Sequence, residues 1–225
     1  MSRLKRFLRG VLLDVDGTLI NSNDAHAEAW AAAFHEFGFD VDFARVRPLV
    51  GMGGDQLLPK LTGLDHRTEL AERITARRAE IFKARHLHTL RAFPGAHELL
   101  ARFRQDELKL VIATSSGEEQ LNEMLEQTGL EGLVERRTTS SDAGHSKPSP
   151  DIINAALEQV HLGADEVLML GDTPYDIEAA ARAGVGTVAV RSGGWPDGAL
   201  SGAVEIFDDV AQLLREYERS PFARG

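Results

Sequence analysis

The sequence contains no cysteine, and this absence excludes disulfide bonds, thiolate metal sites and cysteine nucleophiles. Long hydrophobic runs are also missing. The apolar stretch that follows the basic segment Met1–Arg9 reaches Asp14 almost at once, which is too short for a secretion signal or a membrane span. We therefore expect Met1–Arg9 to be a solvated basic lead-in to the first strand, and the protein to be cytoplasmic.

Positive charge is scarce as well. Lys and Arg number 25 against 35 Asp and Glu, so the formal charge is −10 at pH 7. Such an acidic chain is expected to bind neither nucleic acid nor an anionic membrane non-specifically. An anionic substrate would need local positive charge, which a metal ion or a well-placed lysine can supply.

The chain divides into two kinds of pattern. Between about residues 22 and 90, apolar side chains repeat at helical spacing and no stretch is typical of a strand. Elsewhere, short apolar strands are expected near residues 11–15, 108–113, 138–139, 167–170 and 187–190, with helices between them and a last helix over about 209–218. This alternation predicts an α/β fold with a doubly wound parallel sheet, a Rossmann-like core. The expected domains are an α/β core, residues 1–21 and 91–225, and an inserted all-helical cap, residues 22–90.

Polar groups stand at the ends of the predicted strands. Asp14 and Asp16 end the first strand beside Gly17, and Thr114 and Asp172 follow two others. Because parallel strands place their carboxyl ends on one edge, these groups can converge, and Lys147 lies in a loop that can join them. Carboxylates crowded together need a cation, and oxygen-only ligands suit a hard ion such as Mg²⁺. An aspartate shielded by Mg²⁺ and a lysine can attack a phosphate and form an aspartyl-phosphate.

The same positions resemble the motifs of the haloacid dehalogenase superfamily. The matching stretches are Asp14-Val15-Asp16-Gly17-Thr18, Thr114, Lys147-Pro148 and Gly171-Asp172-Thr173-Pro174-Tyr175-Asp176. Their order and spacing match the phosphatase branch with an inserted helical cap, which holds phosphoglycolate phosphatases and β-phosphoglucomutases. The match extends over nearly the whole chain.

The resemblance implies a role for each matching residue. Asp14 is implied to be the nucleophile, and Asp16 the general acid and base. The hydroxyl of Thr114 is implied to hold the phosphoryl group, and Lys147 to neutralise charge between that group and Asp14. The implied metal ligands for Mg²⁺ are Asp14, Asp16 through its backbone carbonyl, Asp172 and Asp176. For Asp176 three readings stay open: a water-mediated ligand, a partner that orients Lys147, and a helix N-cap.

The expected substrate contacts include residues of both predicted domains: Thr114, Ser115, Lys147, His26, Gly53 and Gly54. His26 occupies the position of a functional histidine in the mutases, but it could equally line the crevice beneath the cap. Gly53 and Gly54 stand in the cap loop in which mutases carry an arginine for the second phosphate. Their bare amides could bind an anionic group at a helix start, or the glycines could simply form a turn.

These observations predict a Mg²⁺-dependent phosphomonoester hydrolase that acts on a small phosphorylated metabolite as a monomer or a homodimer. Asp16 argues against dehalogenation and phosphonate cleavage, because the members of the superfamily that carry out those reactions lack this second acid. Two alternatives remain. One is a sugar-phosphate mutase of the β-phosphoglucomutase type. The other is a binding protein that has lost its activity.

Overall fold

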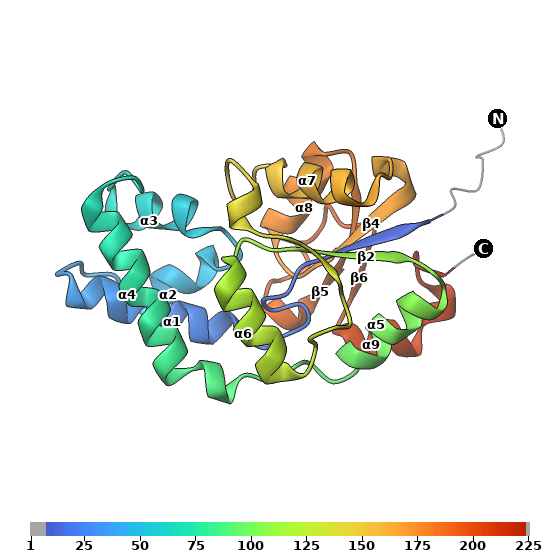
Figure 1. The fold of residues 1–225 in the computed structure, drawn as a ribbon, viewed down its shortest axis with the longest axis horizontal. Coiled ribbons are helices and arrows are strands. Elements are labelled where there is room, and N and C mark those ends of the chain that lie inside the picture. The colour runs from blue at the N-terminus through green and yellow to red at the C-terminus, as the bar shows by residue number, and fades with distance from the viewer. Residues whose placement is uncertain (1–7, 224–225) are drawn as a thin grey trace.

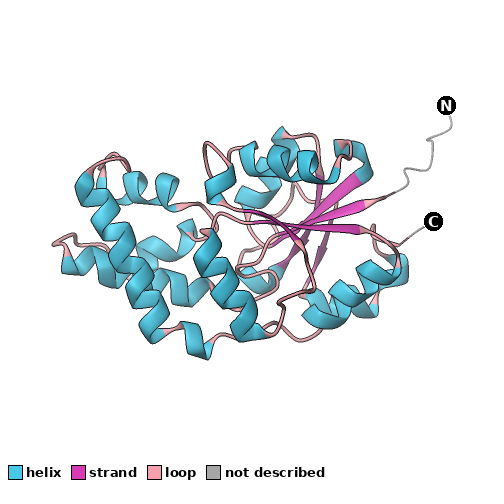
Figure 2. Ribbon diagram, viewed as in Figure 1, coloured by secondary structure: helices cyan, strands magenta, loops and turns pink. Residues whose placement is uncertain are grey.

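The computed structural model describes residues 8–223, so most of the expected basic lead-in and the end of the tail lie outside it. Six parallel strands form one sheet in the order β3-β2-β1-β4-β5-β6. They are β1 (Gly10–Leu13), β2 (Lys109–Ala113), β3 (Arg136–Thr138), β4 (Val167–Gly171), β5 (Gly186–Val190) and β6 (Glu205–Phe207). The predicted doubly wound parallel sheet is confirmed (Figure 2). The edge strand β6 was not predicted.

Alternate strand residues face two separate apolar layers. Leu12 of β1 pairs in register with Val111 and Met169, and these side chains pack under α7 (Asp151–Val160) and α8 (Pro174–Arg182). The next residue, Leu13, faces the opposite layer, as strand geometry requires. That layer is covered by α5 (Ala96–Gln105), α6 (Glu118–Thr128) and α9 (Val210–Arg215). Helices therefore cover both faces of the sheet (Figure 1).

A helical block fills the chain between β1 and α5. Its helices are α1 (Asn23–Glu36), α2 (Phe43–Val46), α3 (Gly54–Thr62) and α4 (Glu69–Arg85), and they lie beside the sheet rather than on it (Figure 1). The chain enters and leaves the block side by side: Asn21 N donates to Arg91 O, and Phe93 N donates to Leu19 O.

Several element ends differ from the expected ones. The last helix stops at Arg215, and a separate 3-10 turn follows it. Such turns lie at Arg47–Leu49, Leu87–Thr89, Ser140–Asp142, Ala164–Glu166, Arg191–Gly193 and Tyr217–Arg219. Within residues 8–223, none of the helices has the length and apolar character needed to span a membrane.

Candidate active site

The structure brings the predicted strand-end residues together at the carboxyl edge of the sheet. Asp14 directly follows β1, Thr114 follows β2, and Asp172 follows β4, so all three leave neighbouring strands. The strand order reverses at β1, which is the position where open α/β sheets bind ligands. All three side chains are buried.

Lys147 lies beneath this edge as a fully buried cation. Its Nζ donates to Asp14 Oδ1 and to Asp176 Oδ1, both at 2.7 Å. Burial acts to lower the pKa of Lys147, but the two carboxylates outweigh it and raise that pKa well above its usual range. The lysine therefore stays charged and fixes the Asp14 carboxylate in one orientation.

Two residues that sequence reasoning did not assign to the site complete this arrangement. The Thr18 hydroxyl lies 2.9 Å from Asp14 Oδ2 and 3.0 Å from Asp172 Oδ1, and Asn23 Nδ2 donates to Asp172 Oδ2 at 2.9 Å. Gly17 makes this packing feasible. Its φ is +80°, and a Cβ there would lie 2.1 Å from Asn23 Nδ2 and 2.2 Å from Asp172 Oδ2.

Three carboxylates gather here against one lysine. Ligand oxygens of Asp14, Asp172 and Asp176 all lie within 4.8 Å of one another. Burial and repulsion from Asp176 raise the pKa of Asp14 to about 7, despite Lys147, and burial and Asp14 raise the pKa of Asp172. The excess negative charge and the oxygen-only donors fit a hard divalent cation.

The structure excludes one of the three roles considered for Asp176. Its Oδ1 accepts from Lys147, and its Oδ2 accepts from the backbone N and the hydroxyl of Thr173. Thr173 is the N-cap of α8, and Asp176 completes the capping box at the third helical position. Asp176 is therefore not the N-cap itself. The observed contacts are those of a residue that orients Lys147.

Asp16 points away from this carboxylate cluster and is held by a different set of donors. Its Oδ1 accepts from Ser22 Oγ at 2.5 Å and lies 2.8 Å from His26 Nε2, and its Oδ2 accepts from Ser116 Oγ at 2.9 Å. Burial acts to raise the pKa of Asp16, but His26 and the two hydroxyls lower it to about 2. The His26 ring stacks on Phe82, with the ring centroids 4.3 Å apart.

Ser22 does not make the hydrogen bond that is usual for a serine at a helix N-cap. It is the N-cap of α1, yet its side chain makes no capping hydrogen bond because the hydroxyl is committed to Asp16. Serine is a preferred N-cap residue, and the helix does start there. The contact with Asp16 could not be read from that signal.

A small inner cavity of about 40 Å³ opens above Asp14 and Asp16. Among its lining residues are five of the predicted contacts: His26, Gly53, Gly54, Thr114 and Ser115. Ser115 Oγ is buried and has no hydrogen-bond partner in the described part of the chain, so it is free to meet a ligand. Lys147 does not line the cavity, and it reaches the site through Asp14 instead.

The cavity is closed by contacts between the helical block and the sheet. Ser146 N donates to Asp55 Oδ2 at 3.1 Å, and Tyr175 Oη donates to Pro48 O at 2.7 Å. Gly53 lies so close to the loop before Lys147 that a Cβ there would be 2.1 Å from Ser146 Oγ. Any larger residue at position 53 would collide with the side chain of Ser146, which is one physical reason for a glycine there.

Comparisons with known proteins agree with this architecture. Residues 11–190 match the family model described as haloacid dehalogenase-like hydrolase. A phosphoglycolate phosphatase from Rhodospirillum rubrum is 29% identical over 214 residues, which cover 91% of this chain and 89% of that protein. Pyrophosphatase PpaX from Oceanobacillus iheyensis is 27% identical, covering 81% of this chain and 83% of its own. The crystal structure of a hydrolase from Pseudomonas syringae superposes with a TM-score of 0.87 at 31% identity, covering 94% of this chain and 98% of that one.

Proposed function

The chain belongs to the haloacid dehalogenase-like hydrolase family, and from that membership and the site geometry we propose a Mg²⁺-dependent phosphomonoester hydrolase that acts on a small phosphorylated metabolite. The observation that carries the proposal is the Asp14 carboxylate. It is held by Lys147 and Thr18, it belongs to the carboxylate cluster, and it lines a cavity shared with Asp16.

Two steps account for the reaction. In the first, an oxygen of Asp14 bonds to phosphorus while the bond from phosphorus to the ester oxygen breaks, and Asp16 gives that oxygen a proton. In the second, Asp16 takes a proton from water as the water oxygen attacks phosphorus. Inorganic phosphate leaves, and Asp14 is restored as a carboxylate.

The residues of this chain hold the reacting groups in place. Mg²⁺, held by Asp14, Asp172 and the backbone carbonyl of Asp16 with Asp176 through water, would supply the positive charge that lets a carboxylate meet a phosphate. The Asp14 oxygens are fixed before substrate arrives. The unpartnered Ser115 hydroxyl and the Thr114 hydroxyl would hold phosphoryl oxygens in the inner cavity.

Asp16 must hold a proton before it can act as the acid in the first step. A carboxylate with a pKa of about 2 is a poor acid donor at neutral pH. The ring of His26, with Nε2 2.8 Å from Asp16 Oδ1, is placed to exchange a proton with that carboxylate. An incoming phosphoryl group brings negative charge to the same cavity, which favours the protonated form of Asp16.

We further propose that residues 22–90 form a cap domain on a core of residues 1–21 and 91–225. The paired connections Asn21–Arg91 and Leu19–Phe93 would serve as the hinge. The observed arrangement would be the closed one, with Gly53 and Gly54 against the inner cavity, and opening at the hinge would admit substrate and release product.

A sugar-phosphate mutase is the second candidate, and the contact between His26 and Asp16 is the observation that favours it, because a mutase needs a general base for a sugar hydroxyl. The loop residues Gly51–Gly54 offer no cation for a second phosphate. The products separate the two candidates. A hydrolase releases free phosphate, whereas a mutase forms an isomer and requires a bisphosphate activator.

The proposal is tested by phosphate release from p-nitrophenyl phosphate and from a panel of metabolite monophosphates, with and without Mg²⁺. Asp14→Asn should abolish the Mg²⁺-dependent release. Asp40→Asn is the matched control, because this aspartate is exposed and remote from the site. Wild-type turnover in Asp14→Asn would show that the nucleophile is wrongly assigned, and no turnover of any substrate by the wild type would remove the proposed function.

A further inference from the structure

The helical block is also fastened to the core at a place outside the inner cavity. The 3-10 turn Arg47–Leu49 of the block, which we call the docking turn, is joined to the core by two hydrogen bonds. Tyr175 Oη donates to Pro48 O at 2.7 Å, and Arg47 Nη2 donates to Gly193 O at 2.8 Å. Arg47 and Tyr175 line neither the inner cavity nor the groove of about 880 Å³ that shares lining residues with it, so they do not meet a substrate there.

Arg47 joins the two parts of the protein through one guanidinium. Its Nη2 reaches the core carbonyl of Gly193, while its Nε donates to Asp24 Oδ1 of α1 at 2.6 Å. The Asp24 carboxylate is exposed, and an ion pair at the surface adds little stability by itself. The contact that depends on the position of the block is therefore the hydrogen bond to Gly193, which is strengthened by the charge of its donor.

The core turn that receives Arg47 lies directly against the carboxylate cluster. Gly193 packs so closely on Asp172 that a Cβ at this position would lie 1.8 Å from Asp172 Oδ2. Ser192, in the same 3-10 turn Arg191–Gly193, donates its hydroxyl to Gly17 O at 2.6 Å. Asp172 is fully buried, so a shift of Gly193 changes the space that its carboxylate can occupy.

Tyr175, the second core contact of the docking turn, is also attached to this cluster. It stands beside Asp176 in the first turn of α8, and its ring packs edge-on against Trp195, with centroids 5.9 Å apart and planes at 87°. Gly51, just beyond the docking turn, lies so close to Thr173 that a Cβ there would be 2.7 Å from Thr173 Cγ2. Both core segments beneath the docking turn therefore hold a carboxylate of the cluster.

We propose that metal binding and docking of the helical block are coupled, with Arg47 and Tyr175 as the positioning residues that link them. The coupling rests on the proposed hydrolase function, whose Mg²⁺ site and cap it presupposes. Asp172 is repelled by its neighbouring carboxylates, and a divalent cation removes that repulsion. The arrangement of Asp172 and Asp176 that holds the cation is then the one that presents Gly193 O and Tyr175 Oη to the docking turn. Because linkage is reciprocal, the docked block raises the affinity for Mg²⁺ by the factor by which Mg²⁺ favours docking.

The first test measures Mg²⁺ binding in two variants by isothermal titration calorimetry. Arg47→Gln removes the charged donor, and Tyr175→Phe removes one hydroxyl while it keeps the ring contact with Trp195. Each variant should raise the Mg²⁺ dissociation constant by about 5-fold, the lower end of the range for coupled sites. Loss of a positive charge alone would favour binding of a cation, so weaker binding by Arg47→Gln would not be a simple charge effect.

Activity gives a second readout on the same variants. Their kcat/KM for p-nitrophenyl phosphate should fall at low Mg²⁺ and recover as Mg²⁺ is raised, because excess metal compensates for weaker binding. A defect unrelated to the metal would persist at saturating Mg²⁺.

Hydrogen exchange tests the reverse direction of the coupling in the wild type. Val50 N and Met52 N donate to Arg47 O and Leu49 O, so exchange of these two amides reports on the docking turn. Mg²⁺ should slow their exchange by a factor similar to the change in its dissociation constant, and it should slow exchange less in Tyr175→Phe.

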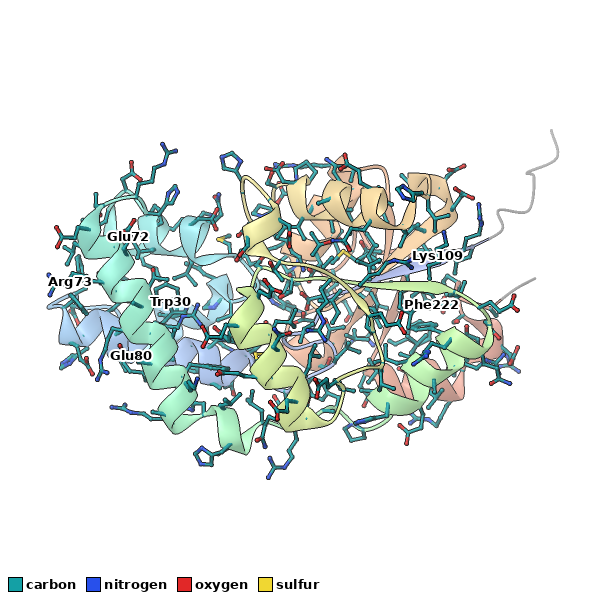
Figure 3. The ribbon with its side chains drawn as sticks, viewed as in Figure 1. Trp30, Glu72, Arg73, Glu80, Lys109 and Phe222 are labelled. Atoms are coloured by element: carbon teal, nitrogen blue, oxygen red, sulfur yellow. The ribbon has the colours of Figure 1, made fainter. Side chains whose placement is uncertain are left out.

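Arg73→Gln is the matched control, because it removes a guanidinium from the same helical block. The Arg73 side chain lies over Phe37, another residue of the block, with 5.5 Å from Cζ to the ring centroid, at the outer edge of the block (Figure 3). It should bind Mg²⁺ as the wild type does.

The outcomes separate the coupling from the function on which it rests. An unchanged Mg²⁺ dissociation constant in folded Arg47→Gln or in Tyr175→Phe, equal weakening in Arg73→Gln, or exchange at the docking turn that Mg²⁺ does not alter would overturn the coupling while the hydrolase stands. A wild type that binds no Mg²⁺ would overturn the metal site of the proposed function and the coupling together. If Arg47→Gln does not fold, Tyr175→Phe and the exchange of the wild type still decide the question.

Discussion

Removal of divalent metal should make the stability of this protein fall as pH rises. Asp14 has an ordinary pKa of 3.8 in the unfolded chain and about 7 in the folded, metal-free protein, because it is buried beside Asp176. Between these values the folded protein holds a proton that the unfolded chain has released. The contribution of Asp14 to the free energy of unfolding is therefore fully present below pH 3.8, declines between pH 3.8 and 7, and is lost above pH 7.

The size of the effect follows from the shift. A change of about three pH units at about 1.36 kcal/mol each gives about 4 kcal/mol lost between the two ends of the window. Asp172 has a raised pKa for the same reasons and acts in the same direction. Asp16, with a pKa of about 2, contributes stability that is fully present above pH 3.8 and is lost as pH falls toward 2, so it adds no pH dependence above pH 5.

The assay is urea unfolding in the presence of a chelator at several pH values from about 5 to about 8.5, analysed by linear extrapolation. Asp14→Asn is the control variant, because an amide cannot ionise. Wild type should lose stability relative to Asp14→Asn as pH rises, so the variant should be the more stable protein at pH 8. Mg²⁺ should stabilise wild type more at pH 8 than at pH 5, since it competes with protons for the same oxygens.

Parallel stability profiles for wild type and Asp14→Asn would refute this reasoning. So would a wild type that becomes more stable than the variant as pH rises. Either result would mean that the negative charge of Asp14 is not destabilising in the metal-free protein. The argument that this cluster needs a cation would then be wrong as well.

Two further variants test individual parts of the site. Asp16→Asn should slow hydrolysis of alkyl phosphates by about 10²–10⁴-fold but p-nitrophenyl phosphate far less, because nitrophenolate leaves without a proton; equal losses would count against Asp16 as the acid. Gly53→Ala places a methyl group 2.1 Å from Ser146 Oγ, so steady-state kcat/KM should fall by about 100-fold on every substrate. The methyl group of Gly198→Ala meets nothing within 4 Å, so that variant should keep wild-type activity. Equal activity of the two variants would show that the close contact between Gly53 and Ser146 is not needed for activity.

Strand ends and their acidic residues could be predicted from the sequence because a charged carboxylate does not fit the buried interior of an apolar strand. A short apolar strand that runs into Asp14, or into Asp172, has few places to put a carboxylate except the edge of a sheet. The edge strand β6 was not predicted, because its three residues, Glu205–Phe207, are too few to show the alternation of apolar and polar residues that marks a strand. One of the roles considered for Asp176 was the N-cap of a helix, whereas the N-cap of α8 is Thr173 and the helix begins at Pro174.

The residues that sequence reasoning missed all act through contacts that only the fold creates. Ser22 and Asn23 are residue types common at helix starts and they stand at the start of α1, so nothing local marks their bonds to Asp16 and Asp172. Ser116 reaches Asp16 across 100 positions of the chain. Arg78 of α4 lines the inner cavity, but it stands in a helix rich in charged residues, so its spacing alone does not show that it faces the site.

The claim at the centre of this account is that Asp14 carries the phosphoryl group during turnover. The direct measurement is mass spectrometry of acid-quenched enzyme mixed with substrate and Mg²⁺ for one turnover. The account predicts that the peptide containing Asp14 gains the mass of one phosphoryl group in wild type and in Asp40→Asn, and that Asp14→Asn shows no such gain. Phosphate release at the wild-type rate with no phosphorylated peptide, or phosphorylation of another residue, would contradict it.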